Sequence, residues 1–247
     1  MSIQSAPRGA FVLSLDLPTA HAATAQVIRQ IRTHQVAATW SVPLGSPLAQ
    51  LADLLGVASG NPGGANELAW RAEPAWADAN VGRGKFAVAL AERASAALEA
   101  GFAMPTLVLD ECRAPAHLDV ASKYGVRALT GGTGGKQLVG MQPKALRFGV
   151  WSVPVSVSIS GGGSWWTNQA RRAIQEINRA VRTGTVCHVH ADLSRGETVA
   201  VLDRVLAHVQ RCRVEGRLVV ETVGQLAARL ARPRVATRPA RSILRAA

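Results

Sequence analysis

Acids, imidazoles and a guanidinium stand at the ends of several short apolar segments of this sequence. In chain order they are Asp16, Glu67, Asp110, Glu111, Arg113, His188, His190 and Asp192. Carboxylates and imidazoles can transfer protons, and a guanidinium can stabilise developing negative charge. If the fold brings these side chains together, they could supply the acid, the base and the cationic group of one catalytic site.

Each candidate also has a purely structural explanation. Asp16 could cap the helix that follows it, and Arg113, close to Pro115, could hold a loop in place. His188 and His190 are two residues apart in an expected strand, so they share one face, where both could be ordinary buried histidines. Taken singly, no residue decides between the two interpretations.

The elements that must position these residues follow from the alternation of short apolar runs with longer amphipathic stretches. Expected strands are Phe11–Leu15, Ala37–Val42, Glu67–Trp70, Thr106–Leu109, Arg127–Leu129, Val153–Ile159, Thr185–His190 and Arg217–Val220. Expected helices are Thr19–His34, Pro47–Leu55, Lys85–Ala100, Ala116–Tyr124, Trp165–Val181, Glu197–Cys212 and Val223–Leu230. About seven or eight strand–helix units predict one α/β domain, a distorted (β/α) barrel, with functional groups at the carboxyl ends of its strands.

The length and the charge define the expected domain organisation. The chain has 247 residues, of which 48% are hydrophobic, and we expect one barrel over residues 1–230. Residues 231–247 contain five arginines and no acid, which contributes to the net charge of +12. We expect this segment to be a disordered tail, and a polyanion-binding arm is the alternative.

Apolar runs such as Val150–Ile159 are much shorter than the roughly 20 residues that span a bilayer, so we expect no membrane helix. The N-terminal segment has no long apolar core after a basic start, which predicts a cytoplasmic location. Cys112, Cys187 and Cys212 are scattered, which favours reduced thiols over a disulfide framework or a zinc cluster.

A glycine-rich segment, SGGGSWW at 160–166, precedes an expected helix. Backbone amides at a helix start could bind an anion or a sugar hydroxyl, and Trp165 and Trp166 could stack on the apolar face of a sugar. A flexible loop followed by core tryptophans is the alternative explanation.

Six segments in chain order resemble motifs of the polysaccharide deacetylase family, which includes the nodulation chitooligosaccharide deacetylase. They are SLDLP (14–18), AATW (37–40), NELAW (66–70), CRAP (112–115), HVHADL (188–193) and VVETVGQLAARL (219–230). The resemblance covers nearly the whole chain and implies a (β/α) barrel that hydrolyses amide bonds of N-acyl sugars. It implies that Asp16 is the catalytic base, that Arg113 orients it and that His190 is the general acid.

The same resemblance indicates that the metal ligands of the family are missing. Leu17 stands at the position of the metal-binding aspartate, and Arg71 and Ala75 stand at the positions of the two histidines. Without ligands, a metal ion can neither polarise the amide carbonyl nor activate a water molecule. We therefore expect no cofactor. A substitute zinc site is the alternative, built from Asp110, Glu111, His188, His190 and Asp192.

Three hypotheses of function remain open. The first is a deacetylase-like protein that binds or acts on a carbohydrate or sugar-nucleotide, with metal-dependent hydrolysis lost. For its ligand contacts we expect Glu67, Arg71, Glu111, His188 and Trp165. The second is an active deacetylase with an unorthodox metal site. The third is a non-catalytic interaction module whose arginine-rich tail binds a polyanion.

Overall fold

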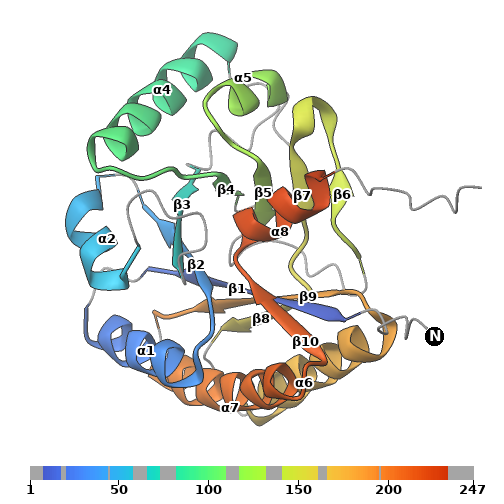
Figure 1. The fold of residues 1–247 in the computed structure, drawn as a ribbon. Helices are drawn as coiled ribbons and strands as arrows, with labels where there is room; N and C mark the ends of the chain where they lie inside the picture. Colours follow the sequence, from blue (N-terminus) through green and yellow to red (C-terminus); the bar gives the residue numbers. More distant parts are fainter. Residues whose placement is uncertain are drawn as a thin grey trace, which may run out of the picture.

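The computed structural model describes residues 8–17, 21–43, 45–57, 66–72, 82–109, 117–131, 141–160, 166–194 and 196–232, with the backbone alone at residues 21–23, 166 and 167. Strands and helices alternate in this part of the chain (Figure 1). The strands are β1 (Gly9–Asp16), β2 (Ala38–Val42), β3 (Asn66–Arg71), β4 (Thr106–Leu109), β5 (Ala128–Gly131), β6 (Lys144–Ala145), β7 (Trp151–Val153), β8 (Val157–Ser160), β9 (Val186–Asp192) and β10 (Leu218–Glu221). The helices are α1 (His21–His34), α2 (Leu48–Leu55), α4 (Arg83–Glu99), α5 (Leu118–Lys123), α6 (Trp166–Thr183), α7 (Gly196–Val214) and α8 (Val223–Ala231), with a short 3₁₀ turn η1 (Arg147–Gly149).

The strands form one curled sheet in the order β6-β7-β5-β4-β3-β2-β1-β9-β8. Strand β10 pairs with the first half of β1, and β2 pairs with its second half, both in parallel. Of the described pairings, only β6 with β7 is antiparallel. Helices α1, α7 and α6 lie together on one side of the sheet (Figure 1). This architecture confirms the predicted α/β barrel class, in an open, distorted form.

Strand β1 shows how the sequence sorts its side chains between the two faces of the sheet. Phe11, Leu13 and Leu15 are fully buried in the large core under the helices. The alternate residues Ser14 and Asp16 point into the barrel, because successive side chains of a strand point to opposite faces. The barrel interior is therefore lined in part by polar groups, which is where the candidate site residues lie.

Helix α8 packs across the barrel at the amino ends of several strands. Val223 and Leu226 of α8 form a separate apolar cluster with Val12, Ala128 and Val153, which belong to β1, β5 and β7. The helix begins with a capping box, in which the Thr222 side chain accepts a hydrogen bond from the Gln225 N–H and Gln225 accepts one from the Thr222 N–H. This cluster fills the barrel opposite the predicted functional mouth.

The expected single strand Val153–Ile159 is wrong. The segment contains the end of β7 and most of β8, and these two strands lie far apart in the sheet order. Pro154 separates them, since proline has no N–H to donate to a strand ladder. Residues 154–156 connect the two ends of the sheet.

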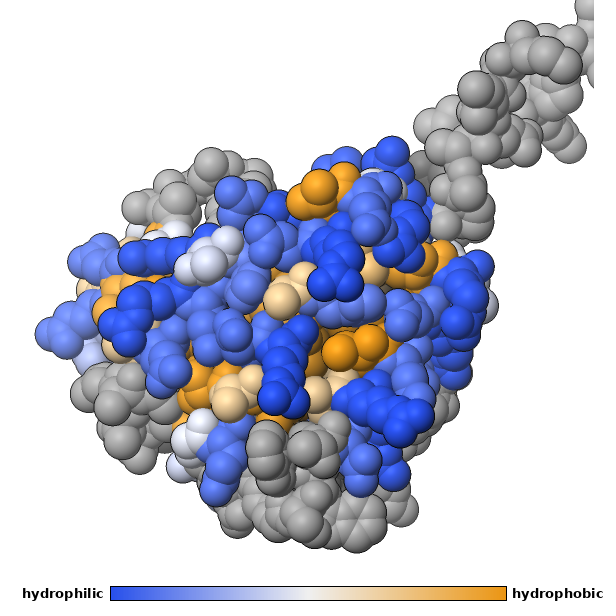
Figure 2. Space-filling view, turned by 90° about the horizontal axis from the view of Figure 1, so that it is seen from below, coloured by the Kyte–Doolittle hydropathy of each residue, from blue (hydrophilic) through white to orange (hydrophobic). Residues whose placement is uncertain are grey.

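The outer surface of the helix layer is largely polar. Figure 2 shows this side of the molecule, where apolar residues appear only as small patches between hydrophilic ones. None of the helices within the described ranges is long and apolar enough to cross a membrane. Helix α8 ends at Ala231, and the arginine-rich residues 233–247 lie outside the described residues, so the division into barrel and tail stays a prediction.

Candidate functional site at the carboxyl ends of the strands

Asp16, Arg71 and His190 meet at the carboxyl ends of β1, β3 and β9. Asp16 and Arg71 are the last residues of their strands, and His190 lies two residues before the end of β9. One oxygen of Asp16, Oδ2, is 3.4 Å from Arg71 Nη1 and 3.3 Å from His190 Nε2. The structure thus brings together two predicted catalytic residues and one predicted ligand-binding residue.

The three side chains differ in how far solvent can reach them. The imidazole of His190 is fully buried and the carboxylate of Asp16 nearly so, whereas 30% of the Arg71 side chain is exposed. A buried carboxylate is stabilised as an anion by a cation beside it. Arg71 can therefore neutralise Asp16 and still present part of its guanidinium to a molecule at the barrel mouth.

A chain of hydrogen bonds continues from His190 into the barrel. Ser14 Oγ lies 3.0 Å from His190 Nδ1 and 2.8 Å from His188 Nε2. The other ring nitrogen of His188, Nδ1, is 3.5 Å from Thr130 Oγ1. Because Ser14 engages Nδ1 of His190, the opposite nitrogen of that ring faces Asp16, with 3.3 Å between Nε2 and Oδ2.

His188 lies two residues before His190 in β9, farther from the mouth, and is fully buried. Burial lowers the pKa of His188 to about 3, with a further contribution from the adjacent His190. The main-chain N–H of His188 donates to Ser156 Oγ at 3.1 Å. We therefore assign His188, expected to contact ligand, to the layer beneath the mouth.

Sequence reasoning missed Ser14, although a signal was present. Ser14 is two residues before Asp16 in an expected strand, and that spacing puts both side chains on one face. Its partners could not be identified in the same way, because they come from β9, more than 170 positions away in the chain. The pairing of β1 with β9 sets Ser14 opposite His190.

Glu67 is at the other end of the barrel, so its expected position at the carboxyl end of the third strand is wrong. It is the second residue of β3, and Oε1 accepts from Thr106 Oγ1 at 2.5 Å while Oε2 accepts from Thr222 Oγ1 at 2.6 Å and from the Gly224 N–H at 3.0 Å. Burial raises the pKa of Glu67, and these hydrogen bonds oppose the rise. Glu67 therefore ties β3 and β4 to the start of α8 and does not face the mouth.

Three predicted site residues, Glu111, Arg113 and Trp165, lie outside the described residues, as does Asp110. Asp192 ends β9, and its Oδ1 accepts a hydrogen bond from the Ser194 N–H at 2.9 Å, which is a local turn contact. The predicted roles of Glu111, Arg113 and Trp165 stay predictions.

The described side chains at the mouth do not fit a divalent metal ion. Within the described ranges, no group of three or more His, Cys, Asp or Glu side chains converges as a metal site would require. Next to Asp16, the chain carries the apolar side chain of Leu17 and the guanidinium of Arg71, which repels a metal cation. The described members of the alternative zinc site, His188, His190 and Asp192, do not form such a group either.

Comparisons with solved structures define the class of the fold, which is that of polysaccharide deacetylases, also called family 4 carbohydrate esterases. A protein of Mycobacterium smegmatis assigned as a polysaccharide deacetylase aligns over 95% of this chain and 96% of its own, with a TM-score of 0.63 and 16% identity. An acetyl xylan esterase from Clostridium thermocellum, solved with a cobalt ion, aligns over 91% and 93%, with a TM-score of 0.53 and 15% identity. The resemblance seen in the sequence motifs is thus confirmed for the fold.

A third similar structure is a pseudoenzyme of carbohydrate esterase family 4 from Bacillus anthracis. It aligns over 90% of this chain and 66% of its own, with a TM-score of 0.55 and 11% identity. No protein-family model matches the sequence, and no curated protein matches it. The fold is therefore established by three-dimensional similarity, at sequence identities too low to transfer an activity.

Proposed function

We propose that this protein binds a carbohydrate or sugar-nucleotide at the mouth of its deacetylase-like barrel and no longer catalyses metal-dependent amide hydrolysis. The observation that carries the proposal is the ion pair between Arg71 and Asp16, with Nη1 and Oδ2 3.4 Å apart. In the family that the sequence motifs resemble, Asp16 corresponds to the catalytic base and Arg71 to a metal-binding histidine. The guanidinium of Arg71 therefore stands where that family has a metal ligand.

This exchange changes the chemistry of the site. A guanidinium can hold a carboxylate or a phosphate by two hydrogen bonds, but it does not lower the pKa of a bound water as a metal ion does. Proton transfer by Asp16 and His190 alone would accelerate a reaction by about 10²–10⁴-fold each. Binding is therefore a better match to these residues than amide hydrolysis.

The partly exposed guanidinium of Arg71 favours a ligand with oxygen acceptors. Phosphates of a sugar-nucleotide are the best match, because charge-assisted hydrogen bonds from arginine to phosphate are about twice as strong as neutral ones. Sugar hydroxyls could bind Asp16 and Arg71 together, since one accepts and the other donates. Glu111 and Trp165 remain our proposed further contacts, and Arg113 remains the residue proposed to orient Asp16. The similarity in fold to a family 4 pseudoenzyme supports this proposal.

Isothermal titration of the untagged protein with a uridine diphosphate N-acetylhexosamine and with an N-acetylglucosamine oligomer tests the binding. We expect saturable binding of at least one probe and about a ten- to hundredfold loss of affinity in Arg71→Ala, since hydrogen bonds to charged groups contribute about 1.5–3 kcal/mol. Arg217→Ala is the matched control, because Arg217 also pairs with a carboxylate, that of Glu215, but precedes β10 at the opposite end of the barrel. Equal affinities of the two variants, or no binding by the wild type, would overturn the proposal.

Acetate release and metal content test the loss of hydrolysis. We expect no acetate from the N-acetylglucosamine oligomer with or without added zinc or cobalt, and little metal in protein purified without chelator. The triple variant Leu17→Asp, Arg71→His, Ala75→His restores the ligand types implied by the resemblance and should gain metal-dependent acetate release. A mutant of the Bacillus anthracis pseudoenzyme is described as having restored activity. Stoichiometric metal or turnover in the wild type would contradict the proposal.

A further inference from the structure

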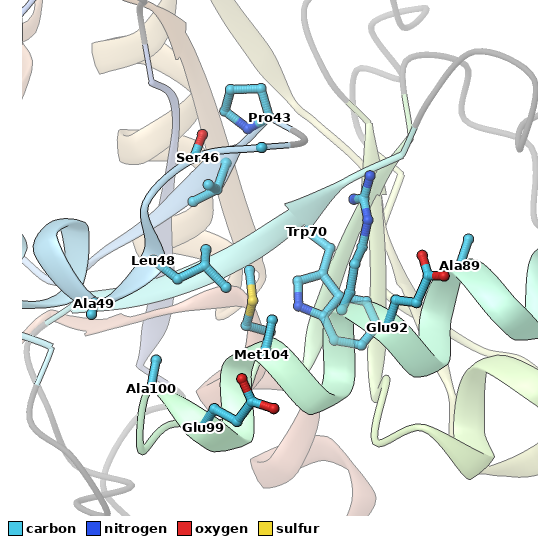
Figure 3. A pocket seen from close by; sticks show the side chains of 14 residues that line it. Pro43, Ser46, Leu48, Ala49, Trp70, Ala89, Glu92, Glu99, Ala100 and Met104 are labelled. Atoms are coloured by element: carbon cyan, nitrogen blue, oxygen red, sulfur yellow. The ribbon is translucent and has the colours of Figure 1, made fainter.

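A cavity separate from the barrel mouth lies between α2 and α4, against the outer face of β2 and β3. Its volume is about 580 Å³, within the range of small-molecule sites. Figure 3 shows the side chains around it, with Leu48 from α2, Trp70 from β3 and Met104 after α4 facing the same space. Since Trp70 and Arg71 are consecutive in β3, the cavity and the mouth lie on opposite faces of the same strand.

The wall of this cavity contains a buried hydrogen-bond donor, the indole N–H of Trp70. Trp70 is only 2% exposed, and its Nε1 has no hydrogen-bond partner among the residues that the structure describes. In Figure 3 the indole nitrogen is on the side of the ring toward Leu48 and Met104. A buried N–H that lacks an acceptor is destabilising, and the large majority of such groups in proteins are satisfied. A ligand that brings an acceptor would remove this penalty.

The remaining lining limits the class of ligand. Most of it is apolar, including Val42, Leu48 and Met104, whereas Glu92 and Glu99 of α4 contribute exposed carboxylates. Arg93 also lines the cavity, but its Nη1 donates to the carbonyl oxygen of Arg71 at 2.7 Å. The two carboxylates disfavour an anion, although the whole chain carries a net charge of +12.

We propose that this cavity binds a small uncharged organic molecule with an apolar body and a carbonyl or ether oxygen that accepts a hydrogen bond from Trp70 Nε1. Such a ligand differs in chemistry from the polar, oxygen-rich ligand of the mouth, so the two sites are tested separately. The ligand would contact Trp70, which precedes Arg71 in β3. It would also contact Arg93, whose side chain donates a hydrogen bond to the carbonyl oxygen of Arg71.

The fluorescent ketone 6-propionyl-2-(dimethylamino)naphthalene is a suitable probe, because it is uncharged and carries one carbonyl on a naphthalene body. We expect saturable binding with a blue shift of its emission. Ala96→Trp should abolish this binding, since Ala96 is an exposed residue of α4 that lines the cavity and a large side chain there would fill it. Ser95→Trp is the matched control, because Ser95 is the preceding exposed residue of the same helix and does not line the cavity.

Trp70→Phe tests the hydrogen bond itself. The substitution keeps most of the apolar volume and removes the N–H, so we expect a three- to tenfold loss of affinity for the ketone. Affinity for 2-(dimethylamino)naphthalene, which lacks the carbonyl, should change much less. Circular dichroism and thermal unfolding establish that each variant is folded. Unchanged binding by folded Ala96→Trp, equal losses for both probes in Trp70→Phe, or no saturable binding by the wild type would overturn the proposal.

Discussion

Gly224 is the second residue of α8, and its missing Cβ makes room for the carboxyl group of Glu67. A Cβ built on Gly224 would be 2.7 Å from Pro105 Cγ and closer still to Glu67 Oε2. The Gly224 N–H donates to that same oxygen at 3.0 Å. The substitution Gly224→Ala therefore tests whether the Glu67 cluster holds the base of the barrel together.

Two opposing effects set the size of the change. Alanine in place of glycine in a helix ordinarily stabilises a protein by about 0.5–1 kcal/mol. Here the added methyl group overlaps a carboxyl that three donors hold in place, and overpacking of this kind costs about 1–3 kcal/mol. Moving Glu67 away would also weaken its buried hydrogen bonds, at about 1 kcal/mol each. We expect a net loss of about 2 kcal/mol in the free energy of unfolding.

Urea unfolding followed by circular dichroism measures this loss. For a slope of about 2 kcal/mol per molar urea, the midpoint should fall by about 1 M. Gly84→Ala is the matched control, because Gly84 is the second residue of α4 and a Cβ there would meet nothing within 4 Å. We expect that control to be as stable as the wild type or more so. If Gly224→Ala unfolds at the same urea concentration as Gly84→Ala, the close approach and the structural role of Glu67 are both refuted.

Two further predictions concern the pH dependence of stability. Burial lowers the pKa of His188 to about 3, so below about pH 6.5 the unfolded chain takes up a proton that the folded chain does not. The free energy of unfolding should therefore decrease as the pH falls from about 6.5 toward 3, by at most about 1.4 kcal/mol per pH unit. His188→Asn cannot take up this proton, so its urea midpoint should fall less steeply with acid than that of the wild type, and equal slopes would contradict the assignment. The raised pKa of Glu67 works in the opposite direction: its contribution is complete below the ordinary carboxyl pKa and is lost as the pH rises through the raised value. The stability of the wild type relative to Glu67→Gln should therefore decrease as the pH rises above the ordinary carboxyl pKa, and a difference that grows with pH would show that ionised Glu67 is favoured.

The alternation of strands and helices could be predicted from the sequence, because each element repeats its apolar residues with its own period. The expected strand Val153–Ile159 failed for a reason that is also local. Its alternating pattern continues through Pro154, but two short strands with different neighbours replace one long strand. Apolar periodicity reports which residues are buried and does not report which strand they pair with.

The candidate site could be predicted only in part. Asp16 and His190 follow from strand ends and motif order, and Arg71 follows from the position that a metal-binding histidine would take. Glu67 was assigned to the mouth although it begins the expected strand Glu67–Trp70, and β3 (Asn66–Arg71) likewise places it near the start of the strand. The direction of a strand decides at which end of the barrel a side chain lies, because only the carboxyl ends of the parallel strands face the mouth.

The sequence by itself determined that the chain folds as an α/β barrel and that the residues at the family's metal-ligand positions are leucine, arginine and alanine. These are properties of periodicity and of residue type, which are present in the chain before it folds. Only the tertiary structure decided that Arg71 pairs with Asp16, that Ser14 links His188 to His190, and that Trp70 faces a cavity behind the same strand. The partners in each case come from strands and helices distant in sequence, and the pairing of strands in the sheet brings them within bonding distance.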